Sequence, residues 1–204
     1  MKKRLPLLAI AGLIAGAALG LMFVTSSANR PAQQGSTVTG KALIGGPFTL
    51  TDQAGRRVTE KDFLGRYMLI FFGYTHCPDI CPSALQVMAA ALDKLGDKAK
   101  EITPVFVTLD PERDTPAKMA DYVKSFDQRI VGLTGSKEEV ASAAKAYRVY
   151  YQLGQPDKQT GDYAVDHAAI IYLMGKDGQF VTHIPHTTNV DQVVNTISKA
   201  LDAS

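Results

Sequence analysis

Apolar and polar positions divide the chain into three stretches with different patterns. Residues 5–24 contain no charged residue, and their length matches the roughly 20 residues that a helix needs to cross a bilayer. Residues 25–44 are rich in Ser, Thr, Gln and Gly, a composition typical of a flexible tether. From residue 45 onward, short apolar runs alternate with segments of helical periodicity. This pattern predicts one folded domain over residues 45–204.

Strands and helices are expected to alternate along that domain. Tyr67–Phe72 is a continuous apolar run between two glycines, which is typical of a strand buried on both faces. Apolar residues recur at helical spacing from Pro82 onward, with Pro82 as the first helical residue, and Val105–Leu109 is a second buried run. The other expected elements are a hairpin over 48–58, a helix from Thr115–Pro116 to Phe126, a strand over 130–133, a helix to Tyr147 whose Ser136 and Glu139 form a capping box, a hairpin over 168–184 and a final helix capped by Asn189. This order predicts an α/β sheet with parallel neighbours, of thioredoxin-like architecture, after the N-terminal hairpin.

The charges around the first apolar run predict its orientation in a membrane. Three basic residues stand within residues 1–4, and the positive-inside bias places them in the cytoplasm. The alternative is a cleavable signal peptide, since residues 26–28 are small, but the apolar core of a signal is about 7–15 residues long. We therefore expect residues 5–24 to be an uncleaved single-pass transmembrane helix. The domain then lies in the periplasm of a bacterium, on the inner membrane, or faces the mitochondrial intermembrane space.

The charge of the remaining chain argues against one class of partner. Without the basic residues at 2–4, the chain has 19 Lys and Arg against 20 Asp and Glu. A near-neutral domain without a basic stripe lacks the electrostatic footprint of a nucleic-acid binder. We expect no nucleic acid among its partners.

The two cysteines of the chain, Cys77 and Cys81, stand close together. A disulfide scaffold would spread its cysteines to join distant loops. Cys81 precedes Pro82, so it is expected near the N-cap of a helix, where unpaired N–H groups favour a thiolate. The Cys-x-x-x-Cys spacing is one residue wider than in thiol–disulfide exchangers, and two thiolates suit a soft ion such as Cu(I), whereas zinc usually requires a fourth ligand. The residues alone leave a soft-metal site and a redox site both open.

A histidine is expected to complete a three-coordinate site. His167 follows Asp166 and precedes an apolar run, which places it at the sheet end where thioredoxin-like sites lie. His76 is adjacent to Cys77, and the side chains of neighbouring residues normally point apart. His183 and His186 are expected in solvent at the far end of a hairpin strand. Spacing alone favours His167 but keeps His76 as a candidate.

Two further patterns allow other kinds of chemistry. Asp110, Glu112 and Asp114 could act as paired carboxylates or as a hard-metal site, but a strand-end turn followed by a capped helix explains them better. The sequence Thr75-His76-Cys77 is superficially similar to that of a peroxidase on a thioredoxin-like fold. No proline precedes the threonine at the position where such enzymes need one.

Three segments resemble the motifs of the Sco/SenC family, copper-binding assembly factors of cytochrome c oxidase. They are Tyr74–Pro82, Asp110–Thr115 and Asp166–His167, and the likeness covers residues from about 45 to 200. The resemblance implies a thioredoxin-like copper-binding domain behind one transmembrane helix. It also implies that Cys77, Cys81 and His167 bind one copper ion, as Cu(I) and/or Cu(II).

The same resemblance implies a function and its partners. The protein is expected to be a metallochaperone that delivers copper to the binuclear copper centre of cytochrome c oxidase subunit II. An upstream periplasmic copper donor and a thiol reductant would serve it. The alternative is a thiol–disulfide oxidoreductase in which Cys77 and Cys81 are a redox-active pair that reduces the copper-ligand cysteines of the oxidase. That reaction does not require His167.

Overall fold

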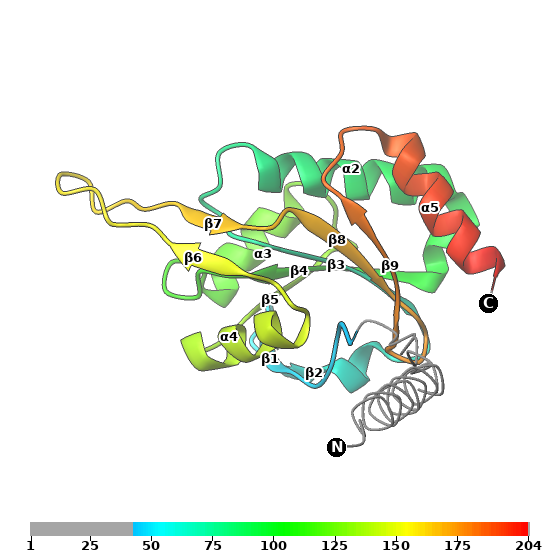
Figure 1. The fold of residues 1–204 in the computed structure, drawn as a ribbon, viewed down its shortest axis with the longest axis horizontal. Coiled ribbons are helices and arrows are strands. Elements are labelled where there is room, and N and C mark those ends of the chain that lie inside the picture. Colours follow the sequence, from blue (N-terminus) through cyan, green and yellow to red (C-terminus); the bar gives the residue numbers. More distant parts are fainter. Residues whose placement is uncertain (1–42, 204) are drawn as a thin grey trace, which may run out of the picture. The chain divides into compact units, whose positions relative to one another are not determined.

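The apolar runs of the sequence form the strands of one mixed sheet (Figure 1). The computed structural model of the chain describes residues 43–203. Its elements, in chain order, are β1 (Thr49–Asp52), β2 (Arg57–Thr59), η1 (Glu60–Phe63), β3 (Tyr67–Gly73), α2 (Ile80–Leu95), η2 (Gly96–Glu101), β4 (Ile102–Thr108), α3 (Pro116–Lys124), β5 (Val131–Thr134), α4 (Lys137–Ala146), β6 (Tyr151–Leu153), β7 (Val165–His167), β8 (Ile170–Met174), β9 (Phe180–Pro185) and α5 (Val190–Asp202).

Strand β3 is a central strand of the sheet, whose order is β2-β1-β5-β4-β3-β8-β9. All seven residues of β3 are buried, as its unbroken apolar run predicts. On one side β3 pairs in parallel with β4, with Phe71 opposite Phe106, and on the other it pairs antiparallel with β8, with Phe71 opposite Ile171. The predicted α/β sheet with parallel neighbours and a late antiparallel hairpin is confirmed.

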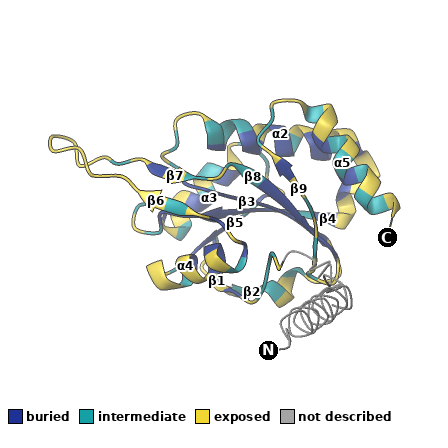
Figure 2. Ribbon diagram, viewed as in Figure 1, coloured by how far each residue is buried: buried dark blue, intermediate teal, exposed yellow. Residues whose placement is uncertain are grey.

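Helices cover both faces of this sheet (Figures 1 and 2). Helices α2, α3 and α5 lie on one face, where Phe106 of β4 packs against Tyr122 of α3 at a ring distance of 5.5 Å. Helix α4 lies on the other face, and Tyr147 at its end packs against Phe72 of β3 at 5.3 Å. Successive residues of a strand point to opposite faces. The apolar side chains of β3 therefore pack against the helices on both faces of the sheet. Tyr147 is buried and is therefore a packing aromatic.

The helix ends form as the sequence predicts. The Ser136 hydroxyl accepts the N–H of Glu139 at 3.2 Å, and the Glu139 carboxylate accepts the N–H of Ser136 at 2.8 Å. The Asn189 side chain likewise accepts the N–H of Gln192 at 3.2 Å. These bonds satisfy N–H groups that have no partner within the helix.

The hairpin of β6 and β7 was not predicted. Strands β6 and β7 form a separate two-stranded sheet, in which Tyr151 lies opposite His167. The connection between them, residues 154–164, is largely exposed, and the hairpin projects from the rest of the domain (Figures 1 and 2). We call β6, residues 154–164 and β7 the arm. The arm places His167 at its base.

The membrane prediction concerns a different part of the chain. Within residues 43–203, no helix combines the length and the apolar character needed to cross a bilayer. The predicted cytoplasmic segment 1–4, the anchor 5–24 and nearly all of the tether 25–44 lie outside the described residues.

Candidate metal centre

Cys77 lies in the loop from β3 to α2, residues 74–79, which we call the cysteine loop, and Cys81 lies in the first turn of α2. Strand β3 ends at Gly73, and α2 begins at Ile80 after the N-cap residue Asp79. Cys81 is therefore the second residue of the helix, whereas the sequence predicted that the helix begins at Pro82. The prediction was wrong by two residues because proline fits the first turn of a helix, where N–H groups have no partner within the helix in any case.

Cys81 packs against the end of the central strand and is 0% exposed. A Cβ atom on Gly73 would stand 2.7 Å from Cys81 Sγ, so the glycine leaves the space that the sulfur occupies. Burial raises the pKa of the Cys81 thiol well above its usual range, and the hydrogen bond from the Tyr74 N–H opposes this rise only in part. In the metal-free protein, Cys81 is a neutral thiol at neutral pH.

Cys77 has a different environment nearer the surface, where it is half-buried. Its sulfur accepts a hydrogen bond from the Cys81 N–H at 3.4 Å. Burial tends to raise the pKa of Cys77, but the N–H groups of Cys81, Asp79 and Ile80 outweigh it, and the pKa is lowered. Cys77 is thus the more readily ionised of the two thiols, as expected for a sulfur at a helix N-terminus.

His167 is the last residue of β7, and its ring reaches the buried cysteine. Its Nε2 atom lies 3.7 Å from Cys81 Sγ, and its Nδ1 atom lies 3.2 Å from the carbonyl oxygen of Ala168. Because a carbonyl oxygen only accepts, Nδ1 carries the hydrogen and the Nε2 lone pair faces the sulfur. Burial lowers the pKa of His167, which keeps the ring neutral and able to bind a metal.

Two aromatic rings surround the imidazole of His167. Phe71 and Tyr74 both approach it edge-on, with ring centroids 6.1 and 6.2 Å away. The Tyr74 hydroxyl also hydrogen-bonds with the backbone of Val165 and with the Cys77 side chain. Tyr74 therefore connects the base of the arm with the cysteine loop, a role that the sequence did not indicate.

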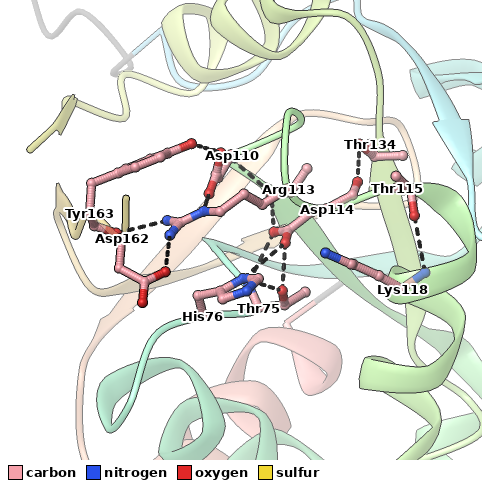
Figure 3. A network of polar contacts seen from close by, with 11 residues as sticks. Thr75, His76, Asp110, Arg113, Asp114, Thr115, Lys118, Thr134, Asp162 and Tyr163 are labelled. Carbon is pink, nitrogen blue, oxygen red and sulfur yellow. Dashed lines mark hydrogen bonds and ion pairs between the residues drawn. The ribbon is translucent and has the colours of Figure 1, made fainter. Parts of the chain in front are cut away.

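The acidic loop between β4 and α3 contacts Thr75 of the cysteine loop (Figure 3). Asp114 is 0% exposed. Its carboxylate accepts the N–H and the hydroxyl of Thr75 at 3.0 and 2.5 Å and the hydroxyl of Thr108 at 2.6 Å. The Asp114 carboxylate therefore holds the cysteine loop in place through hydrogen bonds. This agrees with the predicted strand-end turn and not with a hard-metal site.

The first aspartate of this loop is also engaged within the protein. Asp110 is 1% exposed, and it accepts hydrogen bonds from the Arg113 guanidinium and, at 2.7 Å, from the Tyr163 hydroxyl. Glu112 is more exposed and pairs with Lys137 at 2.8 Å. The acidic residues therefore do not converge on one point, as paired catalytic carboxylates would.

The other three histidines make different contacts. His76 is half-exposed and its Nδ1 lies 3.8 Å from Asp114. His183 is exposed on β9. The solvated position predicted for His186 was wrong, because its Nδ1 is buried and has no hydrogen-bond partner. The backbone N–H of His186 donates to Ala169 at 2.9 Å, which places this residue at the same sheet end as His167.

The centre is only partly assembled in the described residues 43–203. No group of three or more His, Cys, Asp or Glu side chains there is close enough to hold a metal ion as it stands. Cys81 and His167 contact each other, whereas the Cys77 sulfur is directed at the helix N–H.

Comparison with known proteins identifies the family. Residues 36–202 match the model of the SCO1/SenC family. The chain belongs to the SCO1/SenC family. The matched residues include both cysteines and His167, and the resemblance predicted from the three motifs is confirmed.

Curated relatives share this family region but are longer proteins. The human "Protein SCO1 homolog, mitochondrial" is 46% identical over 161 residues, which is 78% of this chain and 53% of that protein. The Arabidopsis thaliana "Protein SCO1 homolog 1, mitochondrial" is 44% identical over 163 residues, which is 79% of this chain and 48% of that protein. The chain thus spans about half the length of these relatives.

Solved structures share the fold. Arabidopsis thaliana ScoI with copper bound has a TM-score of 0.74 and 42% identity, and the match covers 79% of this chain and 99% of that chain. Bradyrhizobium japonicum ScoI with copper bound has a TM-score of 0.70 and 43% identity, covering 77% and 99%. The thioredoxin-like fold predicted for this SCO1/SenC protein is confirmed.

Proposed function

We propose that this SCO1/SenC protein binds one copper ion between Cys77, Cys81 and His167. The observation that carries the proposal is the 3.7 Å separation of Cys81 Sγ and His167 Nε2. With the zinc–sulfur and zinc–nitrogen distances of about 2.3 and 2.0 Å taken as a guide, two ligands at a trigonal angle lie about 3.7 Å apart. The two atoms are therefore already spaced as ligands of one ion.

Cys77 supplies the third ligand by a local movement. It lies in the cysteine loop ahead of α2, and its sulfur accepts a hydrogen bond from the Cys81 N–H at 3.4 Å. When copper binds, this sulfur leaves the N–H group and completes a trigonal site. Being half-buried, Cys77 is also the ligand through which the ion enters from a donor and leaves to a client by thiolate exchange.

The chemistry of the donor set fits copper as cargo. Two thiolates and one imidazole form a soft, three-coordinate site that suits Cu(I), and the imidazole also suits Cu(II). His167 is neutral and gives up no proton, whereas the raised pKa of Cys81 means that its thiol proton leaves as copper binds. Structural zinc sites favour four protein ligands, one more than the three proposed here.

The solved relatives support copper and an oxidase client. Relatives from Arabidopsis thaliana, Bradyrhizobium japonicum and yeast were solved with copper bound. A further solved relative, 25% identical with a TM-score of 0.60, is BsSco, a member of the Sco family of cytochrome c oxidase assembly proteins. We infer that the copper goes to the binuclear centre of oxidase subunit II, from an upstream copper donor and with a thiol reductant that keeps the cysteines reduced.

The predicted transmembrane anchor would place copper delivery at the membrane. With residues 5–24 in the inner membrane, the domain would be held in the periplasm, or in the intermembrane space as the mitochondrial names of several relatives suggest for those proteins. Tethering raises the effective concentration of the copper carrier at a membrane-bound client.

Copper titration of the full-length chain tests the ligand set. Reduced protein is titrated against a coloured Cu(I) chelator and analysed for bound metal, and we expect about one copper per chain. Cys77→Ser, Cys81→Ser and His167→Ala should each weaken binding by at least about tenfold. His183→Ala, which replaces an exposed histidine on β9, is the matched control. Wild-type affinity in the His167→Ala protein would contradict the proposed ligand set.

The asymmetry of the two thiols favours thiol–disulfide exchange as a second candidate. Cys77 has a lowered pKa and is accessible, whereas Cys81 is buried with a raised pKa, as in a pair with one attacking and one resolving sulfur. A disulfide switch has been identified in BsSco. Full oxidase activity in cells carrying His167→Ala, with both cysteine variants inactive, would favour this function over copper delivery.

A further inference from the structure

The base of the arm is not part of the main sheet. Strands β6 and β7 pair with each other and belong to a sheet separate from the seven-stranded one. His167 ends β7, three residues before β8 begins. The main-sheet ladder therefore does not include the strand that carries the imidazole. The short link to β8 brings β7 near the cysteines, and side-chain contacts then hold the strand in its place relative to them.

Arg113 makes the most extensive of these contacts (Figure 3). Its guanidinium lies 3.7 Å from the ring centroid of Tyr163, two residues before β7, and donates to the Tyr163 carbonyl oxygen at 2.8 Å. It also pairs with the buried Asp110, which accepts the Tyr163 hydroxyl at 2.7 Å. The three residues form a closed triangle in which each contacts the other two. We call this triangle the clamp.

Backbone hydrogen bonds within the loop after β4 support the clamp. The N–H groups of Arg113 and Asp114 both donate to the Asp110 carbonyl oxygen, at 3.2 and 3.0 Å, and the Asp110 N–H donates to Thr108 at 2.9 Å. The carboxylate of Asp114, the residue directly after Arg113, accepts hydrogen bonds from Thr75 of the cysteine loop. Residues 110–114 thus contact the arm on one side and the cysteine loop on the other.

The clamp is also linked to the imidazole through Tyr74. The Arg113 guanidinium lies 5.9 Å from the ring centroid of Tyr74, and the Tyr74 ring stands edge-on to His167. Tyr74 interacts with the backbone of Val165 as well, so the chain is held at Tyr163, two residues before β7, and at Val165, the first residue of β7. Arg113 is 16% exposed, and a charge-assisted, stacked contact at a partly buried site is stronger than a surface ion pair.

We propose that Arg113, together with Tyr163 and Asp110, is a positioning residue of the copper centre. The clamp fixes β7 so that His167 Nε2 stays within ligand distance of Cys81. This inference rests on the proposed role of His167 as a copper ligand, but it concerns residues that do not touch the metal. Outer-shell partners that orient a ligand typically change metal affinity by about 10–100-fold when they are replaced.

A double-mutant cycle on the full-length chain separates positioning from general damage. Cu(I) affinity is measured for wild type, Arg113→Ala, His167→Ala and the double variant. We expect Arg113→Ala to weaken Cu(I) binding about tenfold when His167 is present, and by less than about twofold when His167 is absent. Lys176→Ala, which breaks the ion pair with Glu101 at the opposite end of the sheet, is the matched control and should bind copper normally.

More conservative substitutions distinguish the loss of a contact from misfolding as the cause of weaker copper binding. Tyr163→Phe keeps the ring under the guanidinium but removes the hydroxyl, so it should weaken binding less than Tyr163→Leu. Arg113→Lys keeps the charge but loses the planar stacking and the paired donors, so it should resemble Arg113→Ala. Amide hydrogen exchange of the copper-free protein gives a second readout. Exchange in β7 should become faster in Arg113→Ala while exchange in β3 stays unchanged.

The outcomes distinguish the inference from the function on which it rests. Equal losses from Arg113→Ala with and without His167 would overturn the positioning role and leave His167 as a ligand. Unchanged affinity together with unchanged exchange in β7 would overturn it as well. No loss from His167→Ala alone would instead overturn the ligand assignment, and with it the reason for positioning this residue.

Discussion

Cys81 Sγ and His167 Nε2 lie 3.7 Å apart although 86 positions separate them in the chain. The antiparallel pairing of β3 with β8, which sets Phe71 opposite Ile171, brings the start of β8 to the point where β3 passes into the cysteine loop. His167, just before β8, therefore returns to the cysteines. The metal centre is a consequence of sheet topology, completed by side chains from the arm.

The two thiols should differ in their reactivity in the metal-free protein. Cys77 is half-buried with a lowered pKa, whereas Cys81 is fully buried with a raised pKa. Since the thiolate is the nucleophile, we expect iodoacetamide to modify Cys77 at least about tenfold faster than Cys81 at neutral pH. Mass spectrometry of peptides at timed intervals measures both rates. Equal rates in folded protein would contradict the described environments.

Gly73→Ala should disturb the packing of the Cys81 side chain. The added methyl would stand 2.7 Å from Cys81 Sγ and 2.9 Å from Phe106, in a core where overpacking destabilises by about 1–3 kcal/mol. We expect a loss of stability in that range and weaker copper binding. Chemical denaturation measures the free energy of unfolding. The double variant with Cys81→Ala, which removes the nearest atom, should recover part of the stability, and no recovery would contradict the clash.

Much of the fold could be predicted because its signals are local. The capping box of Ser136 and Glu139 and the buried run of β3 each depend on a few neighbouring residues, and both formed as predicted. The β6–β7 hairpin could not be predicted in this way. Its segment contains Gly154 and Gly161 among polar residues, and β6 and β7 are 3 residues each, shorter than the alternating runs that mark a strand. Its pairing is supported by distant contacts.

The same distinction applies to the site. Cys77 and Cys81 were chosen from their spacing, but the clamp joins Arg113 and Tyr163, which are 50 positions apart. No pattern in one sequence connects two such residues. His186 was misplaced for a similar reason, since its burial follows from the strand pairing that sets it beside Ala169. Contacts between distant segments are what sequence patterns leave undetermined.

Asp52 should make stability fall in acid. Burial tends to raise the pKa of this carboxyl, but hydrogen bonds from Arg56 and from the N–H of Ala54 outweigh it, and the pKa is lowered from its ordinary 3.8. A lowered pKa in the folded state gives stability that is complete above about pH 4 and is lost as the pH falls through the folded-state pKa. Denaturation of wild type and Asp52→Asn from pH 7 to 3 should show a difference that shrinks below pH 4. A difference independent of pH would contradict this.

Asp114→Asn should loosen the cysteine loop without involving the arm. The amide replaces one carboxylate oxygen by donors, so the N–H and the hydroxyl of Thr75 lose part of their acceptor. Leaving such a buried group unsatisfied lowers stability by about 1–3 kcal/mol. Thermal unfolding measures this loss. Copper affinity should fall by the same factor in the presence and absence of His167, in contrast to the behaviour expected of Arg113→Ala.

His76→Ala should separate the two histidines that the sequence left as candidates. The Nδ1 atom of His76 faces Thr75 and Asp114 at 3.2 and 3.8 Å, and its side chain is 41% exposed. His167, by contrast, directs a neutral nitrogen at Cys81. We therefore expect His76→Ala to change Cu(I) affinity by less than about twofold, and His167→Ala to lower it by at least about tenfold.

Spectroscopy of the copper(II) form distinguishes the same two residues. Nitrogen coupling in the electron paramagnetic resonance spectrum should persist in His76→Ala and disappear in His167→Ala, because only the latter removes the imidazole that lies against the buried sulfur. Both substitutions remove one histidine beside the same loop, so each serves as the control for the other. The reverse result would place the third ligand on the cysteine loop. The arm would then have no part in holding copper.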